Sequence, residues 1–235
     1  MRQGIDVSRW QGTINWAAVR QSGIEFAILK CGGSDAGFYR DKTFEENYRG
    51  AKANGVMVGV YYFVGEGCTS YEAGAADAKR CLEIIQGKQF EYPIYIDFEA
   101  PSGRDKVGNT EACIGFCETV ERAGYFAGIY SSDISGFKDR LTAQRLTQFS
   151  WWVARYGSKP NRPNDPMHMW QKSSTGKVAG ISGNVDLDES YVDFEKIVKE
   201  RGLNGFVTAG EVVVNKKTLE ERVSDLEVRV ARLEK

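Results

Sequence analysis

The chain of 235 residues is 42% hydrophobic and 12% aromatic, which is enough apolar surface for a sizeable core and excludes a wholly disordered protein. Its 31 Lys and Arg residues nearly cancel its 32 Asp and Glu residues, so the net charge of -1 provides no overall attraction for nucleic acid or an anionic membrane. The longest apolar run, residues 56–64, is far shorter than the roughly 20 residues that cross a bilayer.

Short runs of β-branched and aromatic residues, separated by turn residues, predict eight strands. They span residues 4–8, 26–30, 56–63, 93–99, 126–130, 151–155, 167–171 and 185–187. Helix-like segments fill the gaps between the first six strands, at residues 16–22, 43–54, 71–86, 110–123 and, in broken form, 134–149. The last two gaps disfavour helices, because one carries three prolines and the other is rich in Gly and Ser.

This order of elements predicts an α/β fold, an irregular TIM-like (β/α)5(β)3 barrel, over residues 1–206. An open doubly wound sheet is the alternative, although the chain lacks the dinucleotide-binding fingerprint of that class.

The composition changes abruptly after residue 210, where apolar residues alternate four and three apart, with Val at heptad position a and Leu at d. These residues are Leu219, Val223, Leu226, Val230 and Leu233. We expect a linker at 207–217 and a coiled-coil helix at 218–235, in which Arg222 and Arg229 face Glu227 and Glu234 of a parallel partner. This pattern predicts a homodimer or higher homo-oligomer. A single amphipathic helix packing on its own domain is the alternative, because the segment is short for a stable coiled coil.

Two acidic residues stand at the end of the fourth predicted strand. Asp97 and Glu99 are two residues apart and therefore share one face of that strand. The carboxyl ends of the strands build the active site in parallel β/α barrels. Because close like charges oppose each other's ionisation, one carboxyl of the pair can stay protonated near neutral pH and act as a general acid.

Asp6 and Asp186 interrupt the first and last predicted strands, which become neighbours if the barrel closes. Four inward carboxyls favour glycoside hydrolysis. His168 is the only histidine, which weakens any Ser/His/Asp triad and, with five irregularly spaced cysteines, any metal site. The alternative for each acid is that it caps a loop or pairs with a nearby Lys or Arg.

Aromatic rings can complete a sugar site, because their faces pack on the apolar faces of pyranoses. The candidates for substrate contact are Tyr61, Tyr130, Tyr156 and Trp170, with Gln171 as a hydrogen-bonding partner. Each of these aromatics can also be a core residue.

The segments that contain these acids and aromatic residues resemble the corresponding segments of family 25 of the glycoside hydrolases, the lysozymes typical of bacteriophage endolysins and bacterial autolysins. One departure is Tyr62, which stands where the family motif usually has histidine. The matching segments lie in order within residues 4–206: Gly4-Ile5-Asp6-Val7-Ser8, Gly59-Val60-Tyr61-Tyr62-Phe63, Ile96-Asp97-Phe98-Glu99, Gly128-Ile129-Tyr130-Ser131, Trp152-Val153-Ala154-Arg155-Tyr156, Trp170-Gln171 and Gly183-Asn184-Val185-Asp186.

The resemblance implies a cofactor-free barrel that cleaves the β-1,4 bond between N-acetylmuramic acid and N-acetylglucosamine in peptidoglycan. By matching position, Glu99 would be the general acid and Asp97 would orient the substrate's N-acetyl group, with Asp6 and Asp186 completing the acidic floor. We favour assistance by the N-acetyl oxygen over direct attack by water. A chitinase-type enzyme and a non-catalytic binder of wall glycans are the alternatives.

The N-terminal residues also bear on where the protein acts. Asp6 follows the start closely with no apolar stretch behind it, which argues against a cleaved signal peptide. We therefore expect synthesis in the cytoplasm and action on the bacterial cell wall after release.

Overall fold

The computed structural model describes residues 1–101, 103 and 105–208, so the expected coiled-coil helix at 218–235 and most of the linker lie outside the described residues. The strands are β1 (Arg2–Val7), β2 (Phe26–Gly33), β3 (Tyr39–Arg40), β4 (Met57–Phe63), β5 (Ile94–Asp97), β6 (Ala127–Ser132), β7 (Ser150–Ala154), β8 (Met167–Gly176) and β9 (Val185–Ser190). The helices are α1 (Trp16–Gln21), α2 (Phe44–Ala53), α3 (Tyr71–Ile85), α4 (Lys106–Arg122) and α5 (Phe194–Glu200), with single turns η1 (Arg9–Gln11), η2 (Asp133–Lys138) and η3 (Ala143–Leu146).

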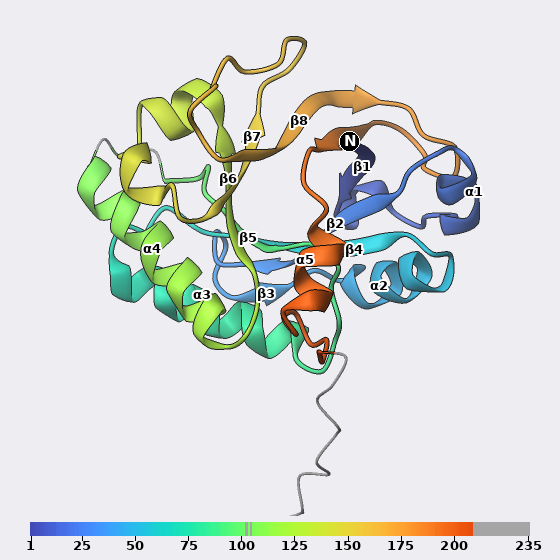
Figure 1. The fold of residues 1–235 in the computed structure, drawn as a ribbon, viewed down its shortest axis with the longest axis horizontal. Helices are drawn as coiled ribbons and strands as arrows, with labels where there is room; N and C mark the ends of the chain where they lie inside the picture. The colour runs from blue at the N-terminus through green and yellow to red at the C-terminus, as the bar shows by residue number, and fades with distance from the viewer. Residues whose placement is uncertain (102, 104, 209–235) are drawn as a thin grey trace, which may run out of the picture.

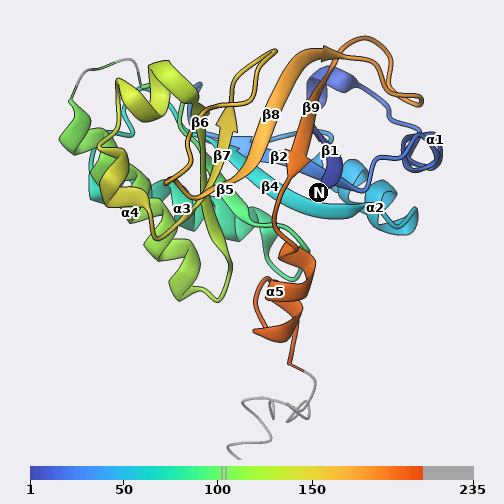
Figure 2. The same cartoon turned by 45° about the horizontal axis from the view of Figure 1, so that its top comes forward.

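The strands close into a barrel in the order β1-β2-β4-β5-β6-β7-β8-β9, because β1 pairs with both β2 and β9. Neighbouring strands run parallel except at β9, which is antiparallel to β1 and to β8. The connections from β7 to β8 and from β8 to β9 carry no helix, and β8 and β9 run side by side in Figure 2. The predicted (β/α)5(β)3 barrel is therefore confirmed.

Alternation along the strands separates two apolar layers. Outward side chains such as Ile5, Ile96 and Val153 pack beneath the helices that surround the barrel in Figure 1. Inward side chains such as Tyr95 and Trp152 fill the barrel itself. This inward layer is largely aromatic.

Two elements were not predicted from the sequence. Strand β3 has only two residues and pairs with the end of β2, so it is too short to show an alternating pattern in the sequence. Helix α5 follows the last strand, and the side chain of Asp193 accepts a hydrogen bond from the backbone N–H of Lys196 to cap its start. Among the described residues, no helix is long and apolar enough to span a membrane.

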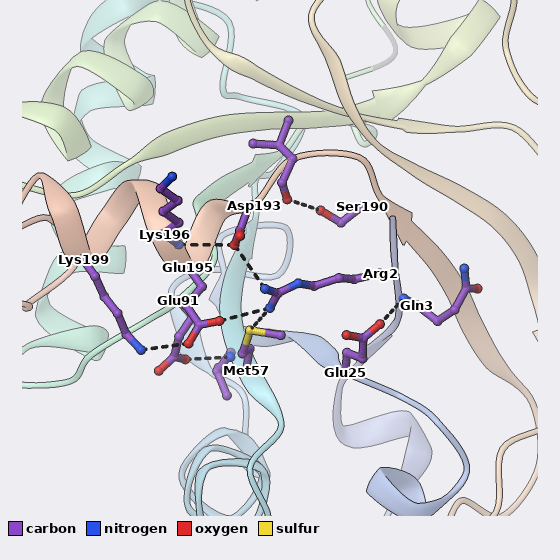
Figure 3. A network of polar contacts seen from close by, with 12 residues as sticks. Arg2, Gln3, Glu25, Met57, Glu91, Ser190, Asp193, Glu195, Lys196 and Lys199 are labelled. Atoms are coloured by element: carbon purple, nitrogen blue, oxygen red, sulfur yellow. Dashed lines mark hydrogen bonds and ion pairs between the residues drawn. The ribbon is translucent and has the colours of Figure 1, made fainter.

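Helix α5 is fastened to the start of β1 by Arg2, as Figure 3 shows. The Arg2 guanidinium lies 3.1 Å from Oε2 of Glu195 and 3.2 Å from Oδ1 of Asp193. It also donates to Sδ of Met57 on β4. These contacts tie the last helix to the end of the barrel at which the parallel strands begin.

Asn204 lies at the same end of the barrel and binds the segments that lead into β5 and β6. It is fully buried, has a positive φ of 55°, and its amide nitrogen donates to the carbonyl oxygens of Phe90 (3.0 Å) and Tyr92 (2.9 Å). Its side-chain oxygen accepts from the backbone N–H of Phe126 at 2.6 Å. The segment after α5 is thereby joined to the residues that lead into β5 and β6.

Candidate active site

The opposite end of the barrel, where the parallel strands finish, contains a polar cavity of about 240 Å³. All four predicted carboxyls line it, as do four of the five predicted substrate contacts. The lining residues are Asp6, Trp10, Lys30, Tyr61, Phe63, Asp97, Glu99, Tyr130, Trp152, Tyr156, Gln171 and Asp186.

Asp97 ends β5 inside the cavity and is only 4% exposed. Its Oδ1 is buried and has no hydrogen-bond partner within the described residues. Burial, followed by the nearby charge of Glu99, raises the pKa of Asp97 well above its usual range. The unpaired oxygen leaves Asp97 with an acceptor for a donor on a bound molecule.

Glu99 lies two residues further along, in the segment that follows β5. Burial raises the pKa of its carboxyl, and the positive charges of Lys30 and Arg140 oppose this rise. A carboxyl with a raised pKa retains its proton to a higher pH than one with an ordinary pKa, which is the property that a general acid needs.

Closure of the barrel brings Asp6 and Asp186 together, because they are paired residues in the β1–β9 register. Burial raises the pKa of Asp186 to about 6, and the charge of Glu99 adds to this rise. The expectation that the first and last strands bring their acids to one cavity thus agrees with the observed pairing. The sequence could not fix the register itself, since it depends on strands about 180 residues apart.

Gln171 on β8 connects the polar groups across the cavity. Its Nε2 donates to Oδ2 of Asp6 at 2.7 Å. Its Oε1 accepts from the hydroxyls of Tyr130 at 2.9 Å and Tyr156 at 3.3 Å. The amide orientation is therefore fixed by both ends, and the two tyrosine hydroxyls are held at defined positions.

Lys30 and Trp10 also line the cavity, although we did not single them out from the sequence. The Lys30 ammonium lies 4.3 Å from the ring centroid of Phe63 and 5.7 Å from those of Tyr61 and Tyr39, and it forms no ion pair in the described part of the chain. Lys30 occupies the same inward parity on β2 as Phe26 and Ile28, so strand alternation could have revealed it.

Trp10 is 77% exposed and lies on η1 directly after β1. A capping box fixes this turn, in which Ser8 accepts from the backbone of Trp10 and Gln11 accepts from that of Ser8. A large exposed aromatic held at a polar cavity offers a flat surface at its mouth.

Trp170 lies elsewhere. Its neighbour Gln171 points into the barrel, so Trp170 points outward, where its Nε1 donates to the Arg155 carbonyl at 2.7 Å. It lines a separate cavity that shares Tyr156 with the first. Tyr62 also points outward, and its hydroxyl lies 3.4 Å from Oδ1 of Asp77 on α3.

The five cysteines are all buried and free, with Sγ of Cys31 3.7 Å from Sγ of Cys81. No group of three or more His, Cys, Asp or Glu side chains is arranged to hold a metal ion among the residues that the structure describes.

The family model for glycosyl hydrolases family 25 matches residues 5–181 of the chain. Lysozyme M1 of Streptomyces globisporus is 32% identical over 211 residues, which cover 78% of this chain and 66% of that protein. The autolytic lysozyme of Clostridium acetobutylicum is 30% identical, over 80% of this chain and 55% of that protein. The chain thus spans less than two thirds of the length of these two relatives.

A solved bacterial lysozyme from Streptomyces coelicolor superposes with a TM-score of 0.70 at 28% identity, over 82% of this chain and 93% of that one. The similarity covers almost all of that structure, so it extends to the barrel as a whole.

Proposed function

Because the chain belongs to family 25 of the glycosyl hydrolases, we propose that it is an N-acetylmuramidase, a lysozyme that cleaves the β-1,4 bond between N-acetylmuramic acid and N-acetylglucosamine in peptidoglycan. The relatives named as lysozymes support this substrate class. The observation that carries the proposal is the pair of carboxyls, the buried Asp97 and the more exposed Glu99, in one cavity lined by aromatic rings.

Glu99 acts as the general acid and gives its proton to the glycosidic oxygen. The oxygen of the substrate's own N-acetyl group attacks the anomeric carbon as the bond to the leaving sugar breaks, and a cyclic oxazolinium intermediate forms. Water then opens this ring and passes a proton to the Glu99 carboxylate, which restores the acid.

Asp97 orients the N-acetyl group during the attack. Its carboxylate is the acceptor for the amide N–H of the substrate. Asp6 and Asp186 complete the acidic floor and favour the positive charge that develops on the sugar ring. Tyr61, Tyr130, Tyr156 and Gln171 contact the sugar, whereas Trp170 is left for a part of the glycan outside the cavity.

The test of the acid is Glu99→Gln, with Glu46→Gln on the exposed face of α2 as the matched control. We expect Glu99→Gln to abolish the clearing of purified cell walls without changing the circular dichroism spectrum, and Glu46→Gln to clear walls at the parental rate. A Glu99→Gln protein with parental activity contradicts the assignment. A parent that degrades chitin oligomers but not peptidoglycan supports the chitinase-type alternative.

NMR of the freshly released reducing ends tests the route. Attack by the N-acetyl oxygen followed by water retains the anomeric configuration, whereas a directly activated water inverts it. An inverted product therefore excludes substrate assistance while leaving Glu99 as the acid.

We further propose that the enzyme acts on the bacterial cell wall after release. On the sequence pattern alone, we also propose that residues 218–235 associate two or more copies of the chain as a parallel coiled coil. Sedimentation of the full chain beside Leu226→Lys, which places a charge in the heptad seam, tests the association. A monomeric parent at micromolar concentration contradicts it.

A further inference from the structure

A fifth carboxyl, that of Asp188, is buried in the barrel beneath the residues that line the cavity. Asp188 stands on β9 opposite Gly4, two residues from the Asp6–Asp186 pair, and is 0% exposed. Its Oδ1 accepts a hydrogen bond from Nε1 of Trp152 at 2.8 Å. Its Oδ2 is buried and has no hydrogen-bond donor among the described residues.

Asp188 is the cross-strand partner of Gly4 on β1 and of Gln171 on β8, and Gln171 donates to Asp6, so the carboxyls of Asp6 and Asp188 lie close together on the inward face of the barrel. Asp6 is 7% exposed, and one of its oxygens already accepts from Gln171. Two buried carboxylates on one inward face repel each other, and each also loses its hydration. A proton between them removes one charge and supplies the missing donor at the same time.

Among the described residues, the groups around Asp6 and Asp188 supply no free positive charge that could balance two carboxylates. The titratable groups around the pair are Asp186 on β9, Asp97 and Tyr95 on β5, Tyr61 on β4, Tyr130 on β6, Tyr156 after β7 and Lys172 on β8. Lys172 is the cation in this set, and its ammonium is held 2.8 Å from Glu189 and 2.8 Å from Gln3. The positive charge of Lys172 is thus largely balanced by Glu189.

We infer that Asp6 and Asp188 share a single proton, and that Asp188 is a positioning residue that fixes the carboxyl of Asp6 through an O–H···O hydrogen bond. The order of contacts is then Trp152 to Asp188, Asp188 to Asp6, and Asp6 to Gln171. Burial, with the charges of Asp188 and Asp186 added, raises the pKa of Asp6 well above its usual range, in agreement with a retained proton.

The consequence for catalysis rests on the proposed function. Gln171 holds the hydroxyls of Tyr130 and Tyr156, so the shared proton fixes one whole wall of the cavity. It also leaves the floor with one negative charge fewer than its carboxyls would carry if all were ionised. Asp188 itself contributes no atom to the lining of the cavity, so it acts through Asp6.

Asp188→Asn is the decisive variant, compared with Asp188→Leu. The Asn oxygen can accept from Trp152 and its NH₂ can donate to Asp6, which reproduces the protonated carboxyl at nearly the same size. Leu fills the space but can do neither. We expect Asp188→Asn to keep kcat within about threefold of the parent and Asp188→Leu to lose tenfold or more, because it leaves buried polar groups without partners.

A second measurement does not depend on activity. The melting temperature of the parent should fall as pH rises through the range in which the shared proton is lost, because the native state prefers the protonated pair. This fall should be smaller in Asp188→Asn, which cannot ionise, and unchanged in the control Asp139→Asn on the exposed surface. A purely structural role of Asp188 would shift the melting temperature equally at every pH.

Two results overturn the inference. One is a folded Asp188→Asn protein that is as inactive as Asp188→Leu, and the other is an Asp188→Asn protein with the parental pH dependence of melting. If the parent fails to clear cell walls, the proposed function fails, but the melting experiment still decides whether Asp6 and Asp188 share a proton.

Discussion

The guanidinium of Arg140 donates a hydrogen bond to the main-chain oxygen of Glu99 at 2.7 Å. The same Nη1 also donates to the carbonyl of Pro101 at 2.8 Å, and the Ser131 hydroxyl donates to that of Phe98 at 2.7 Å. The segment that carries the proposed acid is thus held by its backbone, from Ser131 on β6 and from Arg140, which follows η2. These contacts position the acid through its main chain and use neither of its carboxyl oxygens.

Replacing Arg140 by Met should therefore lower kcat about tenfold with little change in KM, because a misplaced acid affects the reaction more than substrate binding. Loss of the guanidinium also removes a charge that lowers the pKa of Glu99, so the alkaline limb of the kcat profile should move to higher pH. Arg140→Lys, which retains the charge, should keep the limb in place. An unchanged kcat in Arg140→Met contradicts the positioning role.

Lys30 should set the pH range of the enzyme. Its charge lowers the pKa of both Asp97 and Glu99, against the effect of their burial. In Lys30→Met both pKa values rise, so both limbs of the kcat/KM profile should shift to higher pH. The matched control is Lys42→Met, an exposed lysine outside the cavity, which should leave the profile unchanged. A profile in Lys30→Met that coincides with the parental one would rule out this influence.

Asp186 should make the fold less stable as its proton is lost. Its pKa rises from 3.8 to about 6 on folding, so the stabilisation is fully present below pH 3.8 and is lost as pH rises through about 6. The melting temperature of Asp186→Asn should therefore fall less between pH 4 and pH 7 than that of the parent. The difference between the two falls measures the contribution of the Asp186 carboxyl. Equal falls in the two proteins would show that Asp186 titrates normally in the folded chain.

Asn204 should matter for stability and not for catalysis. Asn204→Ala removes three buried hydrogen bonds and places alanine at a positive φ, which should lower the free energy of unfolding by about 2–4 kcal/mol. Urea unfolding measures the loss, and the exposed Asn161→Ala provides the control. The folded variant should retain parental kcat, because Asn204 contacts the end of the barrel away from the cavity. A reduced kcat at low temperature would contradict this separation.

The sequence was sufficient for the barrel and for the arrangement of its acids, because strand alternation and the carboxyl-end rule depend only on local patterns. It was insufficient for deciding which of two adjacent strand residues points into the cavity and how deep in the barrel a residue lies. Trp170 and Gln171 were both expected in the cavity, yet adjacent strand residues point to opposite faces, and only Gln171 lies there. The depth of Asp188 depends on the register between β1 and β9, which no local pattern reveals.

The register between β2 and β4 is also hidden from local sequence patterns, because it shifts between Lys30 and Gly32. Lys30 pairs with Tyr61, but the next paired residues are Gly32 and Tyr62, so one residue of β2 is skipped. Periodicity read from the sequence assumes an uninterrupted ladder and cannot locate such a shift. The shift follows Lys30, so it changes the pairing of Gly32 and Gly33 and not that of Lys30 itself.

The contacts of Asn204 also determine how the barrel can be attached to anything else. They hold the chain four residues before Thr208 against the residues that lead into β5 and β6, so whatever follows Thr208 starts from the far side of the barrel. A tether that begins there leaves the mouth of the cavity clear.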